Sequence, residues 1–195
     1  MKKTVFSLAL ALVFGFSASA TTPVDGEKKE VNVSQSTVTW KGYKVTGSHE
    51  GKINLKSGFL MMESGKLTGG EFVVDMTSIT NTDMTAGNGK EKLEGHLKSD
   101  DFFGVANHPT AKLVFTSVKP FDKNSKSYSV SGDLTIKGIT KPVTLVVSMF
   151  ENKATATIKV DRSKFDVRYG SGSFFDDLGD KAIYDEFDLV VDLAL

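Results

Sequence analysis

Apolar and polar residues alternate along most of the chain after residue 36. In STVTW the side chains of Val38 and Trp40 fall on one face, and in YDEFDLVVDLAL those of Phe187 and Leu189 do the same. A period of two is typical of half-buried antiparallel strands. Turn-forming segments such as ESGKLTGG, DKNSKS, KGITKP and ENK separate these runs. The pattern predicts about eight antiparallel strands, which can close into a barrel or pack as a sandwich.

The apolar face of each strand is rich in Val, Leu, Ile, Phe and Met, and we expect it to point into the fold. In GKINLKSGFLM, Ile53 and Leu55 are expected to be followed by Phe59 and Met61 on the same face. Alternation alone fits a filled core as well as a hollow barrel. The candidates for lining the interior are Val38, Trp40, Ile53, Leu55, Phe72, Val74, Met76, Leu97, Phe102, Phe103, Leu113, Phe115, Leu134, Ile136, Leu145, Val147, Ile158, Phe165, Phe187 and Leu189.

Residues 86–105 interrupt the strand pattern with helical spacing. Leu93 and Leu97 are four residues apart, as on one face of a helix. The Ser-Asp-Asp sequence at 99–101 is typical of an N-cap followed by acids in a first turn, so we expect a second short helix there. The two phenylalanines that follow are expected to form the apolar underside of a helical lid on one end of the barrel.

The N-terminal residues have the pattern of a targeting segment. MKK is positively charged, Thr4 to Phe16 is almost entirely apolar, and ASA places small residues before a cleavage point. This is typical of a signal peptide over residues 1–20, cleaved near Ala20, although a retained N-terminal anchor fits the same pattern. We therefore expect a periplasmic or secreted protein with a flexible polar leader at 21–33 and one domain at 34–195.

Charge and cysteine content narrow the class of protein. The chain has 24 basic and 24 acidic residues, and loss of Lys2 and Lys3 on cleavage would leave 22 against 24. Without a basic excess, nucleic acid is not an expected partner. There is no cysteine, so the fold must be held together by core packing rather than by disulfides. The sequence leaves the oligomeric state open.

No pattern in the chain points to catalysis. It lacks a cysteine nucleophile and a G-x-S-x-G elbow, and YGSGS around Ser171 does not have the required spacing. The paired acids at 100–101 and 176–177 are explained by a helix start and a solvated loop. We therefore expect a protein that is not an enzyme and needs no cofactor.

Three polar residues are candidates for a headgroup site or for the mouth of the barrel. His49 and His96 have no histidine partner at ligand spacing, so we predict no metal site. Headgroup contact and structural hydrogen bonding both remain open for them. Arg162, in VDRSKF, can pair with a mouth-facing carboxylate such as Asp75 or Asp101, or form a surface ion pair of little energetic weight.

Five motifs occur in the order and spacing of a known family. They are GSHEGKINLKSG, GGEFVVDMTSIT, LEGHLKSDDFFGVANHPTAKLVFTS, YSVSGDLTIKGITKPVTL and VDRSKFDV. From about Ser36 to Leu195 the chain resembles the YceI-like family of polyisoprenoid-binding periplasmic proteins. Two features depart from that pattern. Asp166 stands where many members have Gly, and residues 167–187 form a longer loop that contains the aromatic sequence SGSFFDD.

The resemblance implies an all-β fold with a short helical insertion, namely an eight-stranded antiparallel lipocalin-like barrel. Its cavity would hold one polyisoprenoid, isoprenoid quinone or similar long-chain amphiphile, and the protein would act as an exported carrier with transient contact to a membrane surface. An alternative hypothesis is a filled barrel that docks a partner through residues 167–187. In that case Phe174 and Phe175 would carry the function.

Overall fold

The computed structural model describes residues 26–122 and 126–195. The expected signal peptide at 1–20 and the start of the leader lie outside the described residues. The elements are β1 (Glu27–Glu30), β2 (Asn32–Lys44), β3 (Gly47–Glu63), β4 (Lys66–Asn81), α1 (Lys90–Lys98), β5 (Thr110–Pro120), β6 (Ser127–Ile136), β7 (Ile139–Met149), β8 (Lys153–Asp161), the 3₁₀ helices η1 (Arg162–Phe165) and η2 (Gly179–Lys181), and β9 (Ile183–Ala194).

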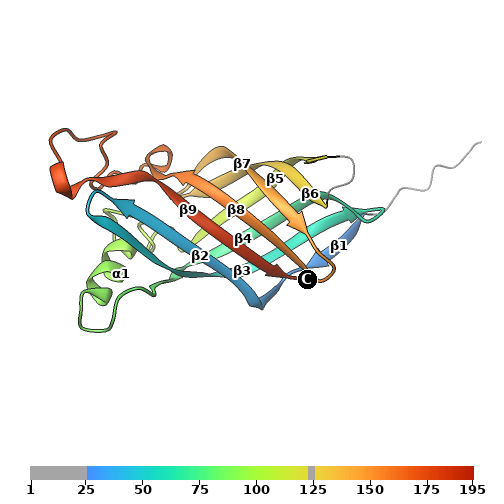
Figure 1. Ribbon diagram of the computed structural model, residues 1–195, viewed down its shortest axis with the longest axis horizontal. Coiled ribbons are helices and arrows are strands. Elements are labelled where there is room, and N and C mark those ends of the chain that lie inside the picture. The colour runs from blue at the N-terminus through green and yellow to red at the C-terminus, as the bar shows by residue number, and fades with distance from the viewer. Residues whose placement is uncertain (1–25, 123–125) are drawn as a thin grey trace, which may run out of the picture.

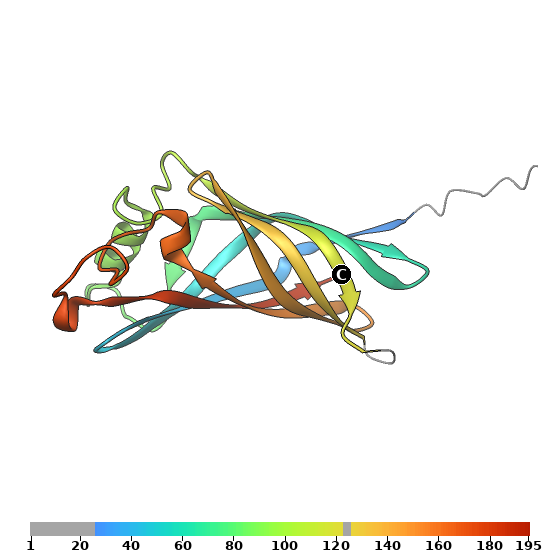
Figure 2. The ribbon, with the colours of Figure 1, turned by 90° about the horizontal axis from the view of Figure 1, so that it is seen from above.

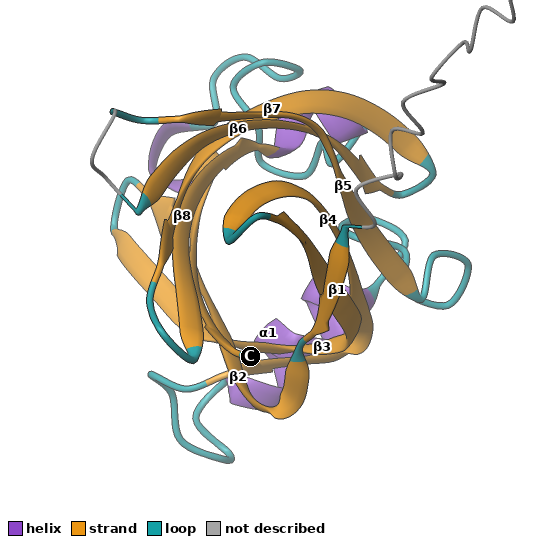
Figure 3. Ribbon diagram, turned by 90° about the vertical axis from the view of Figure 1, so that its right-hand side faces the viewer, coloured by secondary structure: helices purple, strands orange, loops and turns teal. Residues whose placement is uncertain are grey.

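Strands β2 to β9 form a closed antiparallel barrel (Figures 1 and 3). Each strand pairs with the next along the chain, and β9 returns to pair with β2. The register joins Trp40 to Leu189 across the closure. The pairing of β9 with β2 confirms the predicted eight-stranded barrel. In a sandwich, by contrast, each sheet would keep unpaired edge strands.

Tight turns connect neighbouring strands where the sequence supplies residues that accept positive φ. Ser64 and Gly65 have φ of 50° and 76° between β3 and β4, and Lys137 and Gly138 have φ of 50° and 73° between β6 and β7. Two consecutive residues at positive φ are typical of a type I′ hairpin, whose twist matches that of the strands. These turns set the register and therefore decide which face of each strand points inward.

The segment expected to be a flexible leader is partly a strand. Residues Glu27–Glu30 pair with Phe59–Met62 of β3, and Val31 is buried before β2 begins at Asn32. Strand β1 thus continues β2 along the same edge of β3, which leaves the barrel count at eight. The expectation of a flexible polar segment is wrong for residues 27–33, because backbone pairing orders even a charged sequence.

An irregularity in β3 reverses the predicted face of its second half. The pairing with β4 shifts between Leu55 and Ser57, which is the signature of a β-bulge. Leu60 and Met62 are buried beyond this point, whereas Phe59 and Met61 are only partly buried. The expectation that Phe59 and Met61 face inward is therefore wrong, since one extra residue exchanges the two faces of a strand.

The helical segment contains one α-helix and not two. Helix α1 ends where the backbone N–H and side-chain hydroxyl of Ser99 donate to the His96 carbonyl oxygen at 3.1 and 2.8 Å. Residues 100–107 form turns. Ser99 is thus a C-cap residue, and the expectation of a second helix starting there is wrong. Nowhere in residues 26–122 and 126–195 is there a helix with the length and apolarity to span a membrane.

Helix α1, η1, η2 and the long loop before β9 gather at one end of the barrel, which we call the helical end (Figure 2). The C-terminus and β1 lie at the other end, which we call the opposite end (Figure 1). The core residues come from the inward faces of all eight barrel strands. They are joined at the helical end by Leu97, Phe102, Phe103 and Val105.

Candidate ligand-binding cavity

The barrel interior contains two cavities that adjoin along its length. The cavity nearer the helical end, the upper cavity, has a volume of about 130 Å³, and the lower cavity has a volume of about 80 Å³. Val38, Val74, Leu134 and Leu189 line both. Because these four side chains line both spaces, only side chains separate the two cavities, and no backbone runs between them.

The structure places all but one of the predicted lining residues at these cavities. The upper cavity is lined by Trp40, Ile53, Met76, Leu97, Phe102, Phe103, Ile136 and Phe187 in addition to the four shared residues. The lower cavity is lined by Leu55, Phe72, Leu113, Phe115, Leu145, Val147 and Ile158 in addition to the same four. Phe165 lines neither cavity. It is fully buried in η1 beneath the loop at the helical end.

Several lining residues were not among the candidates. Gly42, Ile79, Ala111, Ile183 and Tyr184 complete the upper cavity. Leu60, Ala156, Val191 and Leu193 are among those that complete the lower one. The last three lie on the same alternating faces as Ile158 of β8 and Leu189 of β9, so their inward orientation follows from the period of two in the sequence. Leu60 was missed because the bulge in β3 leaves no local sequence signal.

Aromatic side chains close the upper cavity at the helical end. The ring centroids of Phe102 and Phe103 lie 5.0 Å apart, and Phe103 lies 6.4 Å from Phe187 across the barrel mouth. His96 of α1 lies 5.6 Å from Phe102 and 4.3 Å from Tyr169. All four pairs meet edge to face, which is a favourable arrangement for aromatic rings. This cluster covers the end of the upper cavity that is nearest to α1.

Arg162 is buried beneath this aromatic cluster and lines the upper cavity. Its guanidinium donates hydrogen bonds to the carbonyl oxygens of Tyr184, Val167 and Ile183 at 3.2, 2.8 and 2.9 Å. Its carbon Cζ lies 5.4 Å from the Phe102 ring centroid. Burial lowers the pKa of Arg162 from its ordinary value, against the opposing effect of nearby carboxylates, and a guanidinium stays charged under such a shift.

The expected carboxylate partners of Arg162 are wrong. Asp185 lies 3.4 Å from Nη2, while Asp75 instead accepts hydrogen bonds from Thr77 and Asp101 lines a separate pocket. The alternative of an exposed ion pair is also wrong, because only 2% of the Arg162 side chain is exposed. A long-range contact between η1 and the start of β9 has no signature in the local sequence.

His49 belongs to a hydrogen-bonded network that joins the start of β3 to the end of β4. Its Nδ1 lies 2.9 Å from Asp83 Oδ2, and the same carboxylate accepts from the Glu50 backbone N–H at 3.1 Å and from Asn81. Asn81 is fully buried, and its own backbone N–H donates to Glu94 of α1 at 2.8 Å. Burial raises the pKa of Asp83, but these hydrogen bonds outweigh it and hold the pKa below the ordinary value.

His96 differs from His49 in its polar contacts. Its Nε2 atom is buried and has no hydrogen-bond partner among the described residues. Both histidines line a pocket of about 100 Å³ between α1 and β2, which we call the lateral pocket. Within residues 26–122 and 126–195, no three His, Cys, Asp or Glu side chains come together as a potential metal site.

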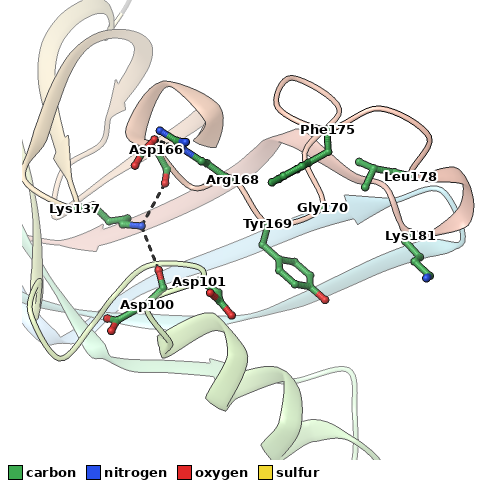
Figure 4. Close-up of a pocket in the computed structure, with 10 residues that line it drawn as sticks. All are labelled: Asp100, Asp101, Lys137, Asp166, Arg168, Tyr169, Gly170, Phe175, Leu178 and Lys181. Carbon is green, nitrogen blue, oxygen red and sulfur yellow. Dashed lines mark hydrogen bonds and ion pairs between the residues drawn. The ribbon is translucent and has the colours of Figure 1, made fainter.

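A larger and more polar pocket opens at the helical end, and we call it the axial pocket (Figure 4). Its volume is about 550 Å³. Lys137 spans it by donating to the carbonyl oxygens of Asp100 and Asp166 at 3.5 and 3.3 Å. Asp166 has φ of 59°, a conformation that favours glycine, and its carboxylate lies 2.5 Å from the Arg168 guanidinium.

These features define a class of protein, an eight-stranded antiparallel lipocalin-like barrel with an apolar interior and one end capped by a helix. The chain belongs to the YceI-like domain family, whose profile matches residues 29–195. A UPF0312 protein of Vibrio campbellii is 31% identical over 149 residues, which cover 74% of this chain and 72% of the relative. A UPF0312 protein of Shewanella denitrificans is 37% identical over 95 residues, which cover 49% of this chain and 46% of that relative.

Solved structures share the same fold at low sequence identity. The crystal structure of Burkholderia cenocepacia BcnA matches with a TM-score of 0.65 at 22% identity, covering 85% of this chain and 99% of that one. A polyisoprenoid-binding domain from Saccharophagus degradans matches with a TM-score of 0.59 at 13% identity, covering 84% of this chain and 95% of the domain. These likenesses establish the barrel topology of the present chain.

Proposed function

We propose that this protein is an exported carrier that holds a polyisoprenoid, an isoprenoid quinone or a similar long-chain amphiphile inside the barrel. The observation that carries the proposal is the apolar interior, in which two adjoining cavities share four aliphatic wall residues. The name of the Saccharophagus domain, which has the same fold, also supports an isoprenoid ligand. The N-terminal signal-peptide pattern supports export.

The energetics of burial favour a long apolar tail. An isoprene unit contains about five carbons, and burial contributes roughly 0.8 kcal/mol per methylene-sized group, or about 4 kcal/mol per unit. Micromolar affinity corresponds to about 8 kcal/mol. Burial of three or more units therefore leaves a surplus after the costs of association and chain ordering. No catalytic step is part of this proposal.

The size of the cavities limits how a tail can be accommodated. Both volumes lie below the roughly 300–1000 Å³ of typical ligand pockets. A bound tail must therefore move apart the side chains that separate the cavities, so that they merge into one channel. The shared aliphatic residues Val38, Val74, Leu134 and Leu189 lie where this must happen, and Met76 lines the upper cavity beside them. Methionine is suited to such rearrangement because its side chain is unbranched and flexible.

Two neighbouring valines on β7 provide a matched test. Val147 lines the lower cavity, while Val146 points outward and is 42% exposed. Val147→Trp should fill the lower cavity and displace at least one isoprene unit. Because that unit contributes more than the 1.4 kcal/mol equivalent to tenfold, the affinity for the lipid should fall by about tenfold or more, and less lipid should co-purify. Val146→Trp adds the same group outside the barrel and should retain lipid.

The measurement is native mass spectrometry of the mature protein purified from a membrane-containing host, followed by lipid extraction. Thermal unfolding of each variant identifies loss of fold, and Val147→Phe provides a smaller substitution if tryptophan is not accommodated. Wild-type protein that carries no lipid, and that does not rebind an isoprenoid quinone after delipidation, would refute the carrier. Equal lipid content in the two tryptophan variants would also contradict it.

The loop before β9 supports a second candidate function, the docking of a protein partner by a barrel that carries nothing. Phe174 and Phe175 on this loop are 39% and 50% exposed. Replacing both by Ser should then abolish function while Val147→Trp leaves it intact. The control is the pair Phe121 and Phe150, which directly follow β5 and β7 and are 62% and 49% exposed. If Val147→Trp abolishes function and the replacement of Phe174 and Phe175 does not, the carrier function is favoured.

A further inference from the structure

We infer that the ligand enters and leaves the barrel sideways, through a portal between α1 and β2 at Gly42, and not along the barrel axis. This inference rests on the proposed carrier function. The portal is the lateral pocket together with its junction with the upper cavity. The ligand it admits is an amphiphile that passes tail first and leaves an oxygen-bearing headgroup at the rim.

The lateral pocket adjoins the upper cavity. The two share five lining residues, namely Trp40, Gly42, Leu97, Phe102 and Ile183. The remaining residues of the lateral pocket are Tyr43, Lys44, His49, Leu93 and His96. An apolar floor thus leads inward from a rim with a lysine, a tyrosine and two histidines. An apolar interior with a polar rim matches an amphiphile whose tail lies inside the barrel and whose headgroup lies at the rim.

Gly42 lies at the junction without a packing reason to be glycine. It occupies the inward face of β2 after Val38 and Trp40, and a Cβ added there would meet no atom within 4 Å. By contrast, a Cβ on Gly51 would lie 2.6 Å from Trp40 Cζ2, so Gly51 is required by packing. Glycine within a strand lowers stability. At position 42 its effect is to keep the passage between the two spaces open.

The axial direction offers no comparable connection. None of the residues that line the axial pocket also lines the upper cavity. Phe102, Phe103 and Arg162 pack between these two spaces. Lys137 further ties the two sides of the axial mouth by its bonds to Asp100 and Asp166. Opening this direction would require the loss of the Lys137 hydrogen bonds and of the aromatic contacts together.

Helix α1 forms the outer wall of the portal, and its displacement would widen the portal at the loss of the hydrogen bond between Asn81 and Glu94 and of the His96 ring contacts. Leu97 is its only buried residue, and glycines at positive φ flank it, with Gly89 at 91° before it and Gly104 at 58° after it. Elements that bury little apolar surface are those that open most readily. Displacement of α1 would also bring the buried and unpaired Nε2 of His96 within reach of a headgroup oxygen, which removes the penalty of leaving it unpaired.

The single tryptophan of the chain reports on this passage. Trp40 lines both the lateral pocket and the upper cavity, so a quinone that enters there quenches its fluorescence. Stopped-flow mixing with a ubiquinone bearing two isoprene units gives the uptake rate, and transfer to empty vesicles gives the release rate. In the series Gly42→Ala, Gly42→Val and Gly42→Leu, both rates should fall with side-chain size, by about tenfold or more for leucine.

Two variants at the same end of the barrel serve as controls. Gly95→Leu adds the same atoms to the exposed side of α1, where a Cβ meets nothing within 4 Å, and should leave both rates unchanged. Leu178→Trp narrows the axial pocket and should also leave them unchanged. Circular dichroism and thermal unfolding show whether each variant is folded, and Gly42→Ala, which adds one methyl group, keeps the series informative if larger residues misfold.

The outcomes separate the portal from the carrier function. Wild-type rates in folded Gly42→Leu, or slowed rates in Leu178→Trp, would overturn the portal while the carrier stands. Saturable quenching in the wild type, together with uptake and release rates that fall with side-chain size at position 42, supports both the portal and the carrier function. If the wild type shows no saturable quenching and carries no lipid, the carrier function fails and the portal fails with it.

Discussion

Arg162 is the one charged side chain that is buried in the described part of the chain. Its three hydrogen bonds to backbone carbonyl oxygens join η1 to the loop after it and to the start of β9. Its replacement would remove the donor from each of these carbonyl groups and the ion-pair partner from Asp185. We therefore expect Arg162→Met to lower the free energy of unfolding by about 3 kcal/mol, measured by urea denaturation.

Arg168 provides the control for Arg162. It also pairs with a nearby carboxylate, that of Asp166, but its side chain is 59% exposed. An exposed ion pair contributes between about 0 and 1 kcal/mol, so Arg168→Met should change stability by no more than that. Equal losses in the two methionine variants would mean that burial does not distinguish these arginines, and the role assigned to Arg162 would be wrong.

At the scale of elements, the bulge in β3 decides which residues form the core near the opposite end. Leu60 is fully buried, whereas its neighbour Met61 is partly exposed. Leu60→Ala should therefore cost about 2–5 kcal/mol of unfolding free energy, and Met61→Ala should cost less than about 1 kcal/mol. Thermal or urea unfolding of the pair measures this. If Met61→Ala costs more than Leu60→Ala, β3 alternates regularly in the folded protein and the bulge is absent.

The same bulge shows where the local sequence pattern fails to predict which face of a strand points inward. Segments that stay regular, such as β6 and residues 187–193 of β9, have the inward faces that alternation predicts. The face of residues 59–62 was reversed because a bulge is set by pairing with β4, which adjacent residues do not encode. Strand β1 was missed for a similar reason, since its charged sequence is ordered only by its partner β3.

At the scale of the whole molecule, the barrel and most of its lining could be predicted, but the division of its interior could not. The residues that alternate inward are local properties of each strand. The separation into two cavities, and the lateral pocket beside Gly42, arise from how eight registers and α1 combine around one axis. The partners of Arg162 likewise depend on segments more than fifteen residues away, such as Tyr184.

Acid stability is a property that several such long-range contacts determine together. Hydrogen bonds from Thr77 lower the pKa of Asp75. For Asp83 and Asp161, burial raises the pKa, but hydrogen bonds from His49 and from Ser163 are among those that outweigh it and leave a lowered value. A carboxylate with a lowered pKa in the folded state favours folding above its unfolded pKa of about 4, and this contribution is lost as pH falls through the folded pKa.

The unfolding free energy should therefore be nearly constant from neutral pH down to about pH 4 and then decrease toward pH 2, as measured by urea denaturation across a pH series. Asp83→Asn should make this decrease shallower, because the variant has one fewer group that takes up a proton more readily in the unfolded chain. Asp180→Asn, in the exposed helix η2, removes a carboxylate without removing any of these hydrogen bonds. If Asp83→Asn and wild type lose stability with the same slope, the network that joins β3, β4 and α1 does not hold Asp83 ionised.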